Sequence, residues 1–202
     1  MDRTLILGTT NDGKLRELVE LLAPHGIACR SLKGLAGSVD VEETGQSFAE
    51  NAALKATLQA RALGAWVLAE DSGLVVPALD GRPGIYSARF SGPGATDAAN
   101  NALLLSQLAG RRGAARAAHY ACHAALADPT GAIVAEASGT CGGLIAEAAA
   151  GTGGFGYDPL FIVPEYQRTF GELPPAVKAV ISHRARAMRA ILPDLVRHLA
   201  AA

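Results

Sequence analysis

GTGGFGYDPLFIVP, residues Gly151 to Pro164, joins a glycine-rich loop to a short apolar run. The run Leu160 to Val163 predicts a buried strand, and the glycines before it let the backbone approach a ligand without a Cβ in the way. Phe155 and Tyr157 can offer a flat face to a base, and Asp158 can offer a polar contact at its edge. The alternative interpretation is a glycine-rich surface turn with Phe155 in the core.

The letters GTGGFG also match the G-x-G-x-x-G pattern of dinucleotide-binding proteins. That pattern has its meaning only where it follows a strand and opens a helix. Here Pro159 and a β-type run follow it, so the sequence argues against a dinucleotide site.

A second glycine-containing loop lies near the N-terminus. Thr4 to Leu7 predicts a short buried strand, Gly8 to Lys14 (GTTNDGK) a polar loop, and Leu15 to Ala23 a helix. A strand, a loop and a helix start in this order expose backbone N–H groups to an anion. It is not a Walker loop, because Leu15 replaces the Ser or Thr that ligates magnesium. Phosphate binding and an ordinary capped helix both fit this loop.

The next informative stretch is Val41 to Gly45, VEETG. Its adjacent carboxylates suit either a solvated segment before a helix or a cation site. An S-x-x-E capping box begins at Ser47 and predicts a helix over Phe48 to Leu63, closed by Gly64. Asn51 and Lys55 are four residues apart and share one face of that helix.

Two acidic residues follow a predicted apolar strand at Trp66 to Ala69. Glu70 and Asp71 come directly after it and precede a Ser-Gly pair. Ligands collect at the carboxyl ends of strands in open α/β sheets, which favours a binding site here. A plain β-turn with Asp-Ser-Gly chemistry is the alternative.

The second half of the chain predicts a hairpin and two helices. Strands at Arg116 to Ala127 and Ala132 to Ser138 flank Asp-Pro-Thr-Gly, which is a hairpin signal. A helical stretch after Pro174 carries Lys178. Ser182 is a candidate N-cap for a final amphipathic helix, so the His and Arg that follow it would sit where an anion is favoured.

Composition excludes several classes of protein. The chain has 202 residues and a formal net charge of −1, so it offers no basic field for a nucleic-acid polymer. No apolar run is long enough to span a bilayer, and the apolar part of the N-terminus is too short for a signal peptide. The three cysteines lack C-x-x-C spacing, so we expect reduced thiols in a cytoplasmic protein, with neither a zinc site nor a disulfide framework.

Taken together, the motifs resemble one family, the inosine/xanthosine triphosphate pyrophosphatases. The segments that carry the resemblance come in the family's order and cover nearly the whole chain. They are Thr9–Lys14 (TTNDGK), Glu42–Gly45 (EETG), Phe48–Lys55 (FAENAALK), Glu70–Leu74 (EDSGL), Pro83–Arg89 (PGIYSAR), Gly151–Pro159 (GTGGFGYDP) and Ser182–Arg184 (SHR).

The resemblance implies an α/β fold over residues 1–202, a single domain with two lobes around a long mixed β-sheet and an active-site cleft between them. It implies hydrolysis of ITP, dITP or XTP to a monophosphate and pyrophosphate, with Mg²⁺ as cofactor and a homodimer as the assembly. Asp71 falls on the position of the proton acceptor and, with Glu42, on the metal carboxylates. The substrate-binding positions fall on Thr9, Thr10, Asn11, Asp12, Gly13, Lys14, Lys55, Ser72, Phe155, Gly156, Tyr157, Asp158, Lys178, His183 and Arg184.

Two residues depart from the family's pattern. Thr10 stands where glycine is common, so the loop backbone would approach phosphate less freely. Glu70 stands where many members have Asp, and it keeps the charge.

Two other functions remain open at this level. One is a related pyrophosphatase with a different base pocket, acting on modified pyrimidine or methylated nucleotides. The other is a nucleotide-binding module without turnover, against which the acidic residues Glu42, Glu70 and Asp71 argue, because binding alone needs only the lysines.

Overall fold

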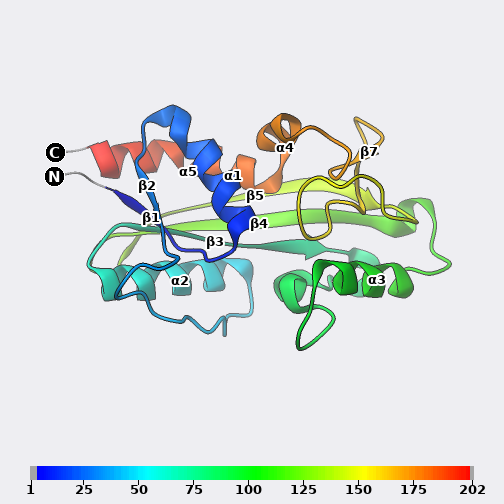
Figure 1. Ribbon diagram of the computed structural model, residues 1–202, viewed down its shortest axis with the longest axis horizontal. Coiled ribbons are helices and arrows are strands. Elements are labelled where there is room, and N and C mark those ends of the chain that lie inside the picture. Colours follow the sequence, from blue (N-terminus) through cyan, green and yellow to red (C-terminus); the bar gives the residue numbers. More distant parts are fainter. Residues whose placement is uncertain (1–3, 201–202) are drawn as a thin grey trace. The chain divides into compact units, whose positions relative to one another are not determined.

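A computed structural model describes residues 4–200 of the chain (Figure 1). The predicted domain over residues 1–202 also includes residues 1–3 and 201–202, which lie outside the described part. The fold is α/β, as predicted, with one mixed sheet of seven strands in the order β2-β1-β3-β4-β5-β6-β7. The strands are β1 (Leu5–Leu7), β2 (Cys29–Ser31), β3 (Val67–Val75), β4 (Ala117–Ala127), β5 (Ile133–Ile145), β6 (Phe161–Val163) and β7 (Arg168–Thr169).

Five α-helices and four short 3₁₀ segments within residues 4–200 accompany the sheet. The α-helices are α1 (Asp12–Leu22), α2 (Phe48–Leu63), α3 (Asp97–Gln107), α4 (Pro175–Ile181) and α5 (His183–Ala200). The 3₁₀ segments are η1 (Ala23–His25), η2 (Pro77–Leu79), η3 (Gly84–Arg89) and η4 (Gly113–Arg116). None of the described helices has the length and apolarity needed to cross a membrane.

The chain divides into two compact units. Unit 1 comprises Met1–Asp71, Cys122–Gly139 and His183–Ala202, and unit 2 comprises Ser72–Ala121 and Thr140–Ser182. Whether these units form a single domain, and whether a cleft separates two lobes, stay predictions from the resemblance.

Unit 1 contains parallel strands with helices on both faces. β1 pairs in parallel with β2 and with β3. One core cluster joins these strands to α1 and α5 through residues such as Leu18 and Ile191, and another joins their opposite face to α2 through small residues such as Ala52 and Ala56. Alanine on α2 lets this helix approach the sheet closely, and burying it removes apolar surface from water.

Unit 2 has its own core, built mainly from aromatic and branched residues. Phe161, Phe170 and Tyr120 pack together, with the rings of Phe161 and Phe170 stacked at 5.4 Å between centroids. Leu104 and Leu108 from the α3 region complete the cluster. The strands β5, β6 and β7 pair antiparallel, whereas β1 pairs in parallel with β2 and β3, so the sheet is mixed.

The sequence predicted α2 to the residue. Ser47 caps its start by accepting from the N–H of Glu50, and Gly64 ends it in the left-handed conformation. The Glu50 side chain reaches back to the N–H of Gln46 instead of completing the box at Ser47. Local capping chemistry therefore sufficed to place this helix.

Three predicted boundaries were wrong. α1 begins at Asp12, not Leu15, because the Asn11 side chain accepts from the N–H of Lys14 and caps the helix inside the predicted loop. β5 continues seven residues past its predicted end at Ser138. The strand predicted to end at Ala69 runs on to Val75 as β3, so Glu70 and Asp71 lie inside a strand and not in a turn.

Candidate active site

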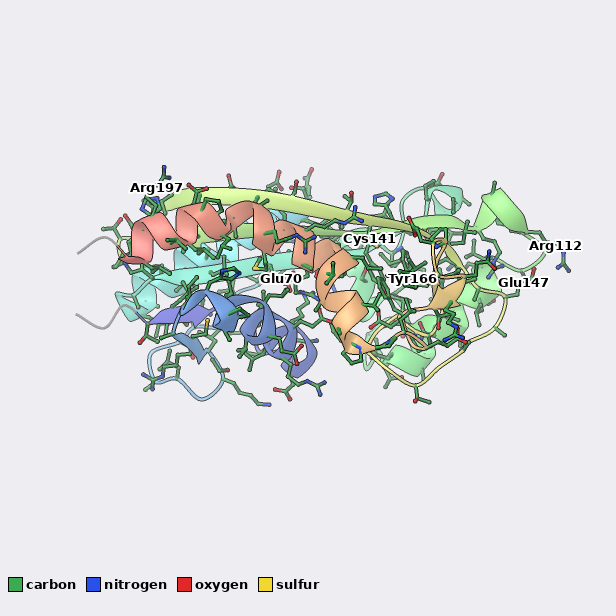
Figure 2. All side chains as sticks on the ribbon, turned by 90° about the horizontal axis from the view of Figure 1, so that it is seen from above. Glu70, Arg112, Cys141, Glu147, Tyr166 and Arg197 are labelled. Carbon is green, nitrogen blue, oxygen red and sulfur yellow. The ribbon has the colours of Figure 1, made fainter. Side chains whose placement is uncertain are left out.

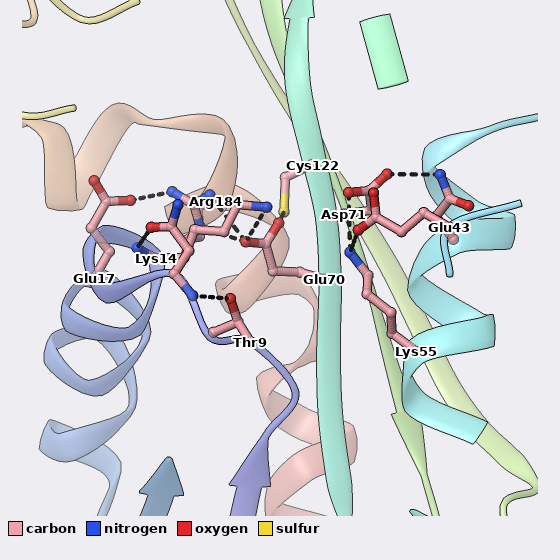
Figure 3. A network of polar contacts seen from close by, with 11 residues as sticks. Thr9, Lys14, Glu17, Glu43, Lys55, Glu70, Asp71, Cys122 and Arg184 are labelled. Carbon is pink, nitrogen blue, oxygen red and sulfur yellow. Dashed lines mark hydrogen bonds and ion pairs between the residues drawn. The ribbon is translucent and has the colours of Figure 1, made fainter. Parts of the chain in front are cut away.

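Glu70 and Asp71 are consecutive residues of β3, and successive side chains of a strand point to opposite faces of the sheet. Figure 3 shows the consequence: the two carboxylates lie on opposite sides of the strand, each in its own network. The sequence predicted that both residues follow the end of a strand, and this was wrong because β3 continues through them.

The Glu70 side faces α1 and the start of α5. Its Oε1 lies 3.2 Å from the Nζ of Lys14 and 3.1 Å from the Nη2 of Arg184. The other carboxylate oxygen, Oε2, lies 3.6 Å from the thiol sulfur of Cys122. Burial and the Glu70 carboxylate raise the pKa of Cys122 well above its usual value, so this thiol stays protonated and donates to Glu70.

Arg184 is the largest fully buried side chain among residues 4–200, with only 1% of its surface exposed. Its Nη1 donates to Glu17 on α1, and its Nε and Nη2 both donate to Glu70 Oε1. Burial alone would lower the pKa of Arg184, but the Glu70 and Glu17 carboxylates raise it by more. The pKa therefore lies above its usual value, and the guanidinium stays charged. The sequence did not single out Glu17, although its place one helical turn after Lys14 puts both residues on one face of α1.

The Asp71 side faces α2. Asp71 Oδ1 accepts from the Nζ of Lys55 at 3.1 Å, and Oδ2 accepts from the Nδ2 of Asn51 at 3.2 Å. Lys55 also donates to Glu43 Oε1 at 2.7 Å. Burial raises the pKa of Asp71 more than Lys55 and Lys14 lower it, so this carboxylate has more affinity for a proton than an exposed aspartate.

Of the two adjacent acids in the VEETG segment, Glu43 contacts this network and Glu42 is exposed. Glu42 was predicted, together with Asp71, to be a metal carboxylate, and that role stays a prediction. Glu43 and Asn51 were not among the predicted site residues, although the spacing of Asn51 and Lys55 on one face of α2 pointed toward them.

The predicted phosphate loop lies at the start of α1. The Thr9 hydroxyl accepts from the N–H of Asn11, and the Asn11 side chain caps the helix. Thr10, Asn11 and Asp12 are exposed, and Gly13 is half-buried. Asp12 forms an exposed ion pair, at 3.0 Å, with Lys33, a residue that follows β2. A capped helix therefore explains the local conformation, and the exposed loop leaves its polar groups accessible.

The glycine-rich loop of unit 2 is held by α3 and by a buried aspartate. Asp97 on α3 accepts from the N–H of Gly156 at 2.6 Å, and Asn101, one turn further along the helix, donates to the carbonyl of Gly156 at 3.0 Å. Asp158 accepts from the N–H of Phe155 at 2.9 Å and pairs with Lys178. Gly154 has φ of +74°, and a Cβ there would collide with the Asp158 carboxylate, so glycine is required.

The aromatic residues of this loop divide in role. Tyr157 belongs to the core of unit 2, and its hydroxyl donates to the carbonyl of Ser87 at 2.8 Å. Phe155 is half-buried, and the Nζ of Lys178 lies 4.6 Å from the centre of its ring. Of the two aromatic faces that the sequence offered for a base, the structure therefore leaves that of Phe155.

The remaining predicted positions lie beside these networks. Ser72 follows Asp71 in β3 and is half-buried, whereas His183, at the start of α5, is buried. Figure 2 places Glu70 in the interior, in contrast to Arg112 and Glu147, whose exposed side chains pair at 2.9 Å on the surface of unit 2.

The donor set around Asp71 suits Mg²⁺ bound jointly with phosphate. Among residues 4–200, no group of three or more His, Cys, Asp or Glu side chains could hold a metal ion by itself. Mg²⁺ is usually bound by one or two carboxylates together with substrate phosphates, and carboxylate oxygens are its preferred ligands. Asp71 with an acid of the VEETG segment would meet that requirement.

The chain and its fold match a known family. The chain belongs to the Ham1 family, whose model matches residues 5–194. A protein of Rhodopirellula baltica named dITP/XTP pyrophosphatase is 50% identical over 193 residues, which is 96% of this chain and 93% of that protein.

Solved structures agree. A HAM1 protein from Coxiella burnetii is 38% identical and superposes with a TM-score of 0.86, covering 96% of this chain and 98% of its own. A nucleoside-triphosphatase, or dITP/XTP pyrophosphatase, from Mycobacterium abscessus is 41% identical with a TM-score of 0.75, covering 95% and 99%.

Proposed function

We propose that this chain hydrolyses deaminated purine nucleoside triphosphates, namely dITP, ITP and XTP, to the monophosphate and pyrophosphate. The enzyme class, a nucleoside-triphosphate pyrophosphatase, is that of relatives matching nearly the whole length of the chain. The observation that carries the proposal is the buried Asp71 carboxylate, which Lys55 and Asn51 hold in place beside an acidic loop.

In the proposed reaction, water attacks the α-phosphorus and the bond from that phosphorus to the bridging oxygen of the β-phosphate breaks. The electron pair leaves with pyrophosphate, and the proton of the attacking water passes to Asp71. The pKa of Asp71 is shifted upward, toward neutral pH. A general base works best when its pKa lies near the pH at which the enzyme operates. No side chain acts as a covalent nucleophile, because positioning and charge stabilisation account for most of such a reaction.

Lysines neutralise the substrate's charge. Lys14 at the start of α1 and Lys55 on α2 bring their ammonium groups to Glu70 and Asp71, respectively. We propose that these groups bind phosphate oxygens when substrate is present. The first turn of α1, which follows this loop, would offer backbone N–H groups to the same anion.

Mg²⁺ is the proposed cofactor. Asp71 and Glu42 would hold it, and Glu43, which already contacts Lys55, is a second candidate from the same segment. When bound, the ion supplies charge neutralisation and orientation of phosphate oxygens. Exchanging each Glu for Gln, and comparing the Mg²⁺ concentration that gives half-maximal rate, decides between the two acids.

Base selection is proposed to rest on stacking and hydrogen bonds. Phe155 would stack on the base, in the loop that Gly156, Tyr157 and Asp158 complete, and Lys178 would support that ring. His183, Arg184 or backbone N–H groups of the loops would donate to the C6 carbonyl of hypoxanthine or xanthine. Adenine has an amine at that position, and a site built around donors rejects such an analogue by about 10⁴-fold, because its own polar groups are left unpaired.

The deciding experiment is a substrate panel with the purified chain. ITP, dITP, XTP, ATP and GTP are incubated with and without Mg²⁺, and pyrophosphate and monophosphate are quantified. We expect Mg²⁺-dependent release from ITP, dITP and XTP and not from ATP, and GTP, whose base shares the C6 carbonyl, tests whether the site excludes a 2-amino group. In H₂¹⁸O the label should enter the monophosphate and not pyrophosphate, which locates the attack. Equal rates with ATP would refute the base selection, and binding of ITP without hydrolysis would indicate a module without turnover.

The predicted homodimer and the cytoplasmic location stay predictions.

A further inference from the structure

Helix α2 carries two buried amide side chains that hold the same neighbouring segment. Gln59, 3% exposed, accepts from the N–H of Val39 at 3.2 Å and donates to its carbonyl at 2.5 Å. Asn51, 0% exposed, accepts from the N–H of Gly45 at 2.8 Å. Each amide therefore ties the segment from Val39 to Gly45, which contains Glu42 and Glu43, to the helix.

The two amides differ in what the NH₂ group meets. In Gln59 it binds a backbone carbonyl, whereas in Asn51 it donates to Asp71 Oδ2 at 3.2 Å. Since the Asn51 oxygen is committed to the Gly45 N–H, the amide has only one orientation that satisfies both partners. The reversed amide would set an oxygen against the carboxylate and an NH₂ against an N–H.

Asp71 is consequently fixed at both oxygens by one helix. Lys55 binds Oδ1 and Asn51 binds Oδ2, and these two residues lie one turn apart on α2. Hydrogen bonds to both oxygens restrict rotation of the carboxylate plane. A fixed plane is what a proton acceptor needs to meet an attacking water in one geometry.

The contact at Gly45 is unusually close. A Cβ at this residue would lie 2.6 Å from Asn51 Oδ1 and 2.8 Å from Glu50 Cβ, closer than real contacts allow. Glycine is thus needed for the acidic segment to reach Asn51. Asn51 therefore bonds both to the segment that carries Glu42 and Glu43 and to the Asp71 carboxylate. This one side chain fixes the position of the segment relative to the carboxylate.

We propose that Asn51 is a positioning residue for the pyrophosphatase reaction, one that orients the Asp71 carboxylate and ties the acidic segment to it. This inference rests on the proposed function. Asn51 touches neither substrate nor reacting atoms; it acts through Asp71.

The test compares Asn51→Ala with Gln59→Ala. Both variants free the same segment from the same helix and leave buried backbone groups unpaired, so both should lower the melting temperature. Asn51→Ala also removes the donor to Asp71, so its kcat for ITP should fall about 10–100-fold below that of Gln59→Ala, because small misplacements of a reacting group cost that much. Its KM for ITP, and its affinity for a non-hydrolysable ITP analogue measured by calorimetry, should stay within about two-fold of wild type.

Asn51→Asp provides a second variant that keeps the side-chain volume and the bond from Gly45. It replaces the donor toward Asp71 by an oxygen, so it should also lose turnover while still binding the analogue. A folded Asn51→Asp or Asn51→Ala variant whose kcat equals that of Gln59→Ala overturns the inference. Equal losses of analogue affinity and kcat would also overturn it, since they indicate a damaged binding site. A wild-type protein that releases no pyrophosphate from ITP would refute the proposed function instead.

Discussion

Two regions that carry predicted site residues, one in each unit, are built on different principles. In unit 1, charged side chains from β3, α1, α2 and α5 form two networks on opposite faces of one strand, and their positions follow from strand alternation. In unit 2, the glycine-rich loop is shaped by bonds to its backbone from Asp97, Asn101 and Asp158. The first region depends on the identity of its side chains and the second on the path of its main chain.

This difference predicts that substitutions in unit 1 affect turnover and that those in unit 2 affect folding or base affinity. The largest expected effect is that of Asp71→Asn. The amide keeps the size of the side chain but accepts no proton, so kcat for ITP should fall by about 10²–10⁴-fold. Pyrophosphate release and the melting temperature are measured on one sample. A lowered melting temperature with normal turnover per folded molecule would assign Asp71 to structure and remove the contrast.

The next effect in size is that of Asp158→Asn in unit 2. Asp158 and Lys178 form a buried ion pair, and removing one member of such a pair leaves the other charge uncompensated, at a cost of about 3 kcal/mol. For a chain of this length that corresponds to a fall of about 6–12 °C in melting temperature.

Two comparisons sharpen this result. Combining Asp158→Asn with Lys178→Met should recover much of the stability, because the stranded ammonium is gone. Arg112→Ala, which breaks the exposed pair with Glu147, should change the melting temperature by about 2 °C or less, since surface ion pairs contribute little. An unchanged melting temperature in Asp158→Asn would show that the loop does not depend on its aspartate.

The smallest of the three effects is that of Phe155→Ala. The ring is half-buried and not part of the fully buried core of unit 2, so folding should survive. Stacking of a base on an aromatic ring is worth about 1–3 kcal/mol, which predicts a KM for ITP raised by about 5–150-fold with kcat largely kept. Steady-state kinetics with ITP measures both, and an unchanged KM would return Phe155 to the role of a core residue.

How far the sequence could be interpreted differs in the same way. The bounds of α2 followed from a capping serine and a terminal glycine, which act within a few residues. The α/β class and the family were likewise predicted correctly, and the enzyme class is confirmed by the relatives. Signals that act locally, or that recur as ordered motifs, survive in a single sequence.

Features that depend on distant partners could not be predicted from the sequence. The polar residues Glu70 to Gly73 resemble a turn, and only pairing within the sheet makes them part of β3. The preference of Lys55 for Glu43 over Glu42 depends on how Asn51 and Gln59 hold the acidic segment. Tyr157 looked available to a base, but the unit 2 core and the Ser87 carbonyl bind it. The deciding contacts are tertiary: pairing within the sheet for β3, bonds that include one across 20 residues from Val39 to Gln59 for the acidic segment, and the unit 2 core for Tyr157.

The alternation of Glu70 and Asp71 along β3 has a consequence for how this gene can vary. Loss or gain of a single codon between the start of β3 and these residues would slip the strand by one position and exchange the faces to which the two carboxylates point. Glu70 would then meet α2, and Asp71 would meet Lys14 and Arg184, so both networks would fail together even though every residue was retained. Substitution can modify one network at a time, but a change of length here alters both at once, so we expect the segment from Val67 to Asp71 to keep one fixed length.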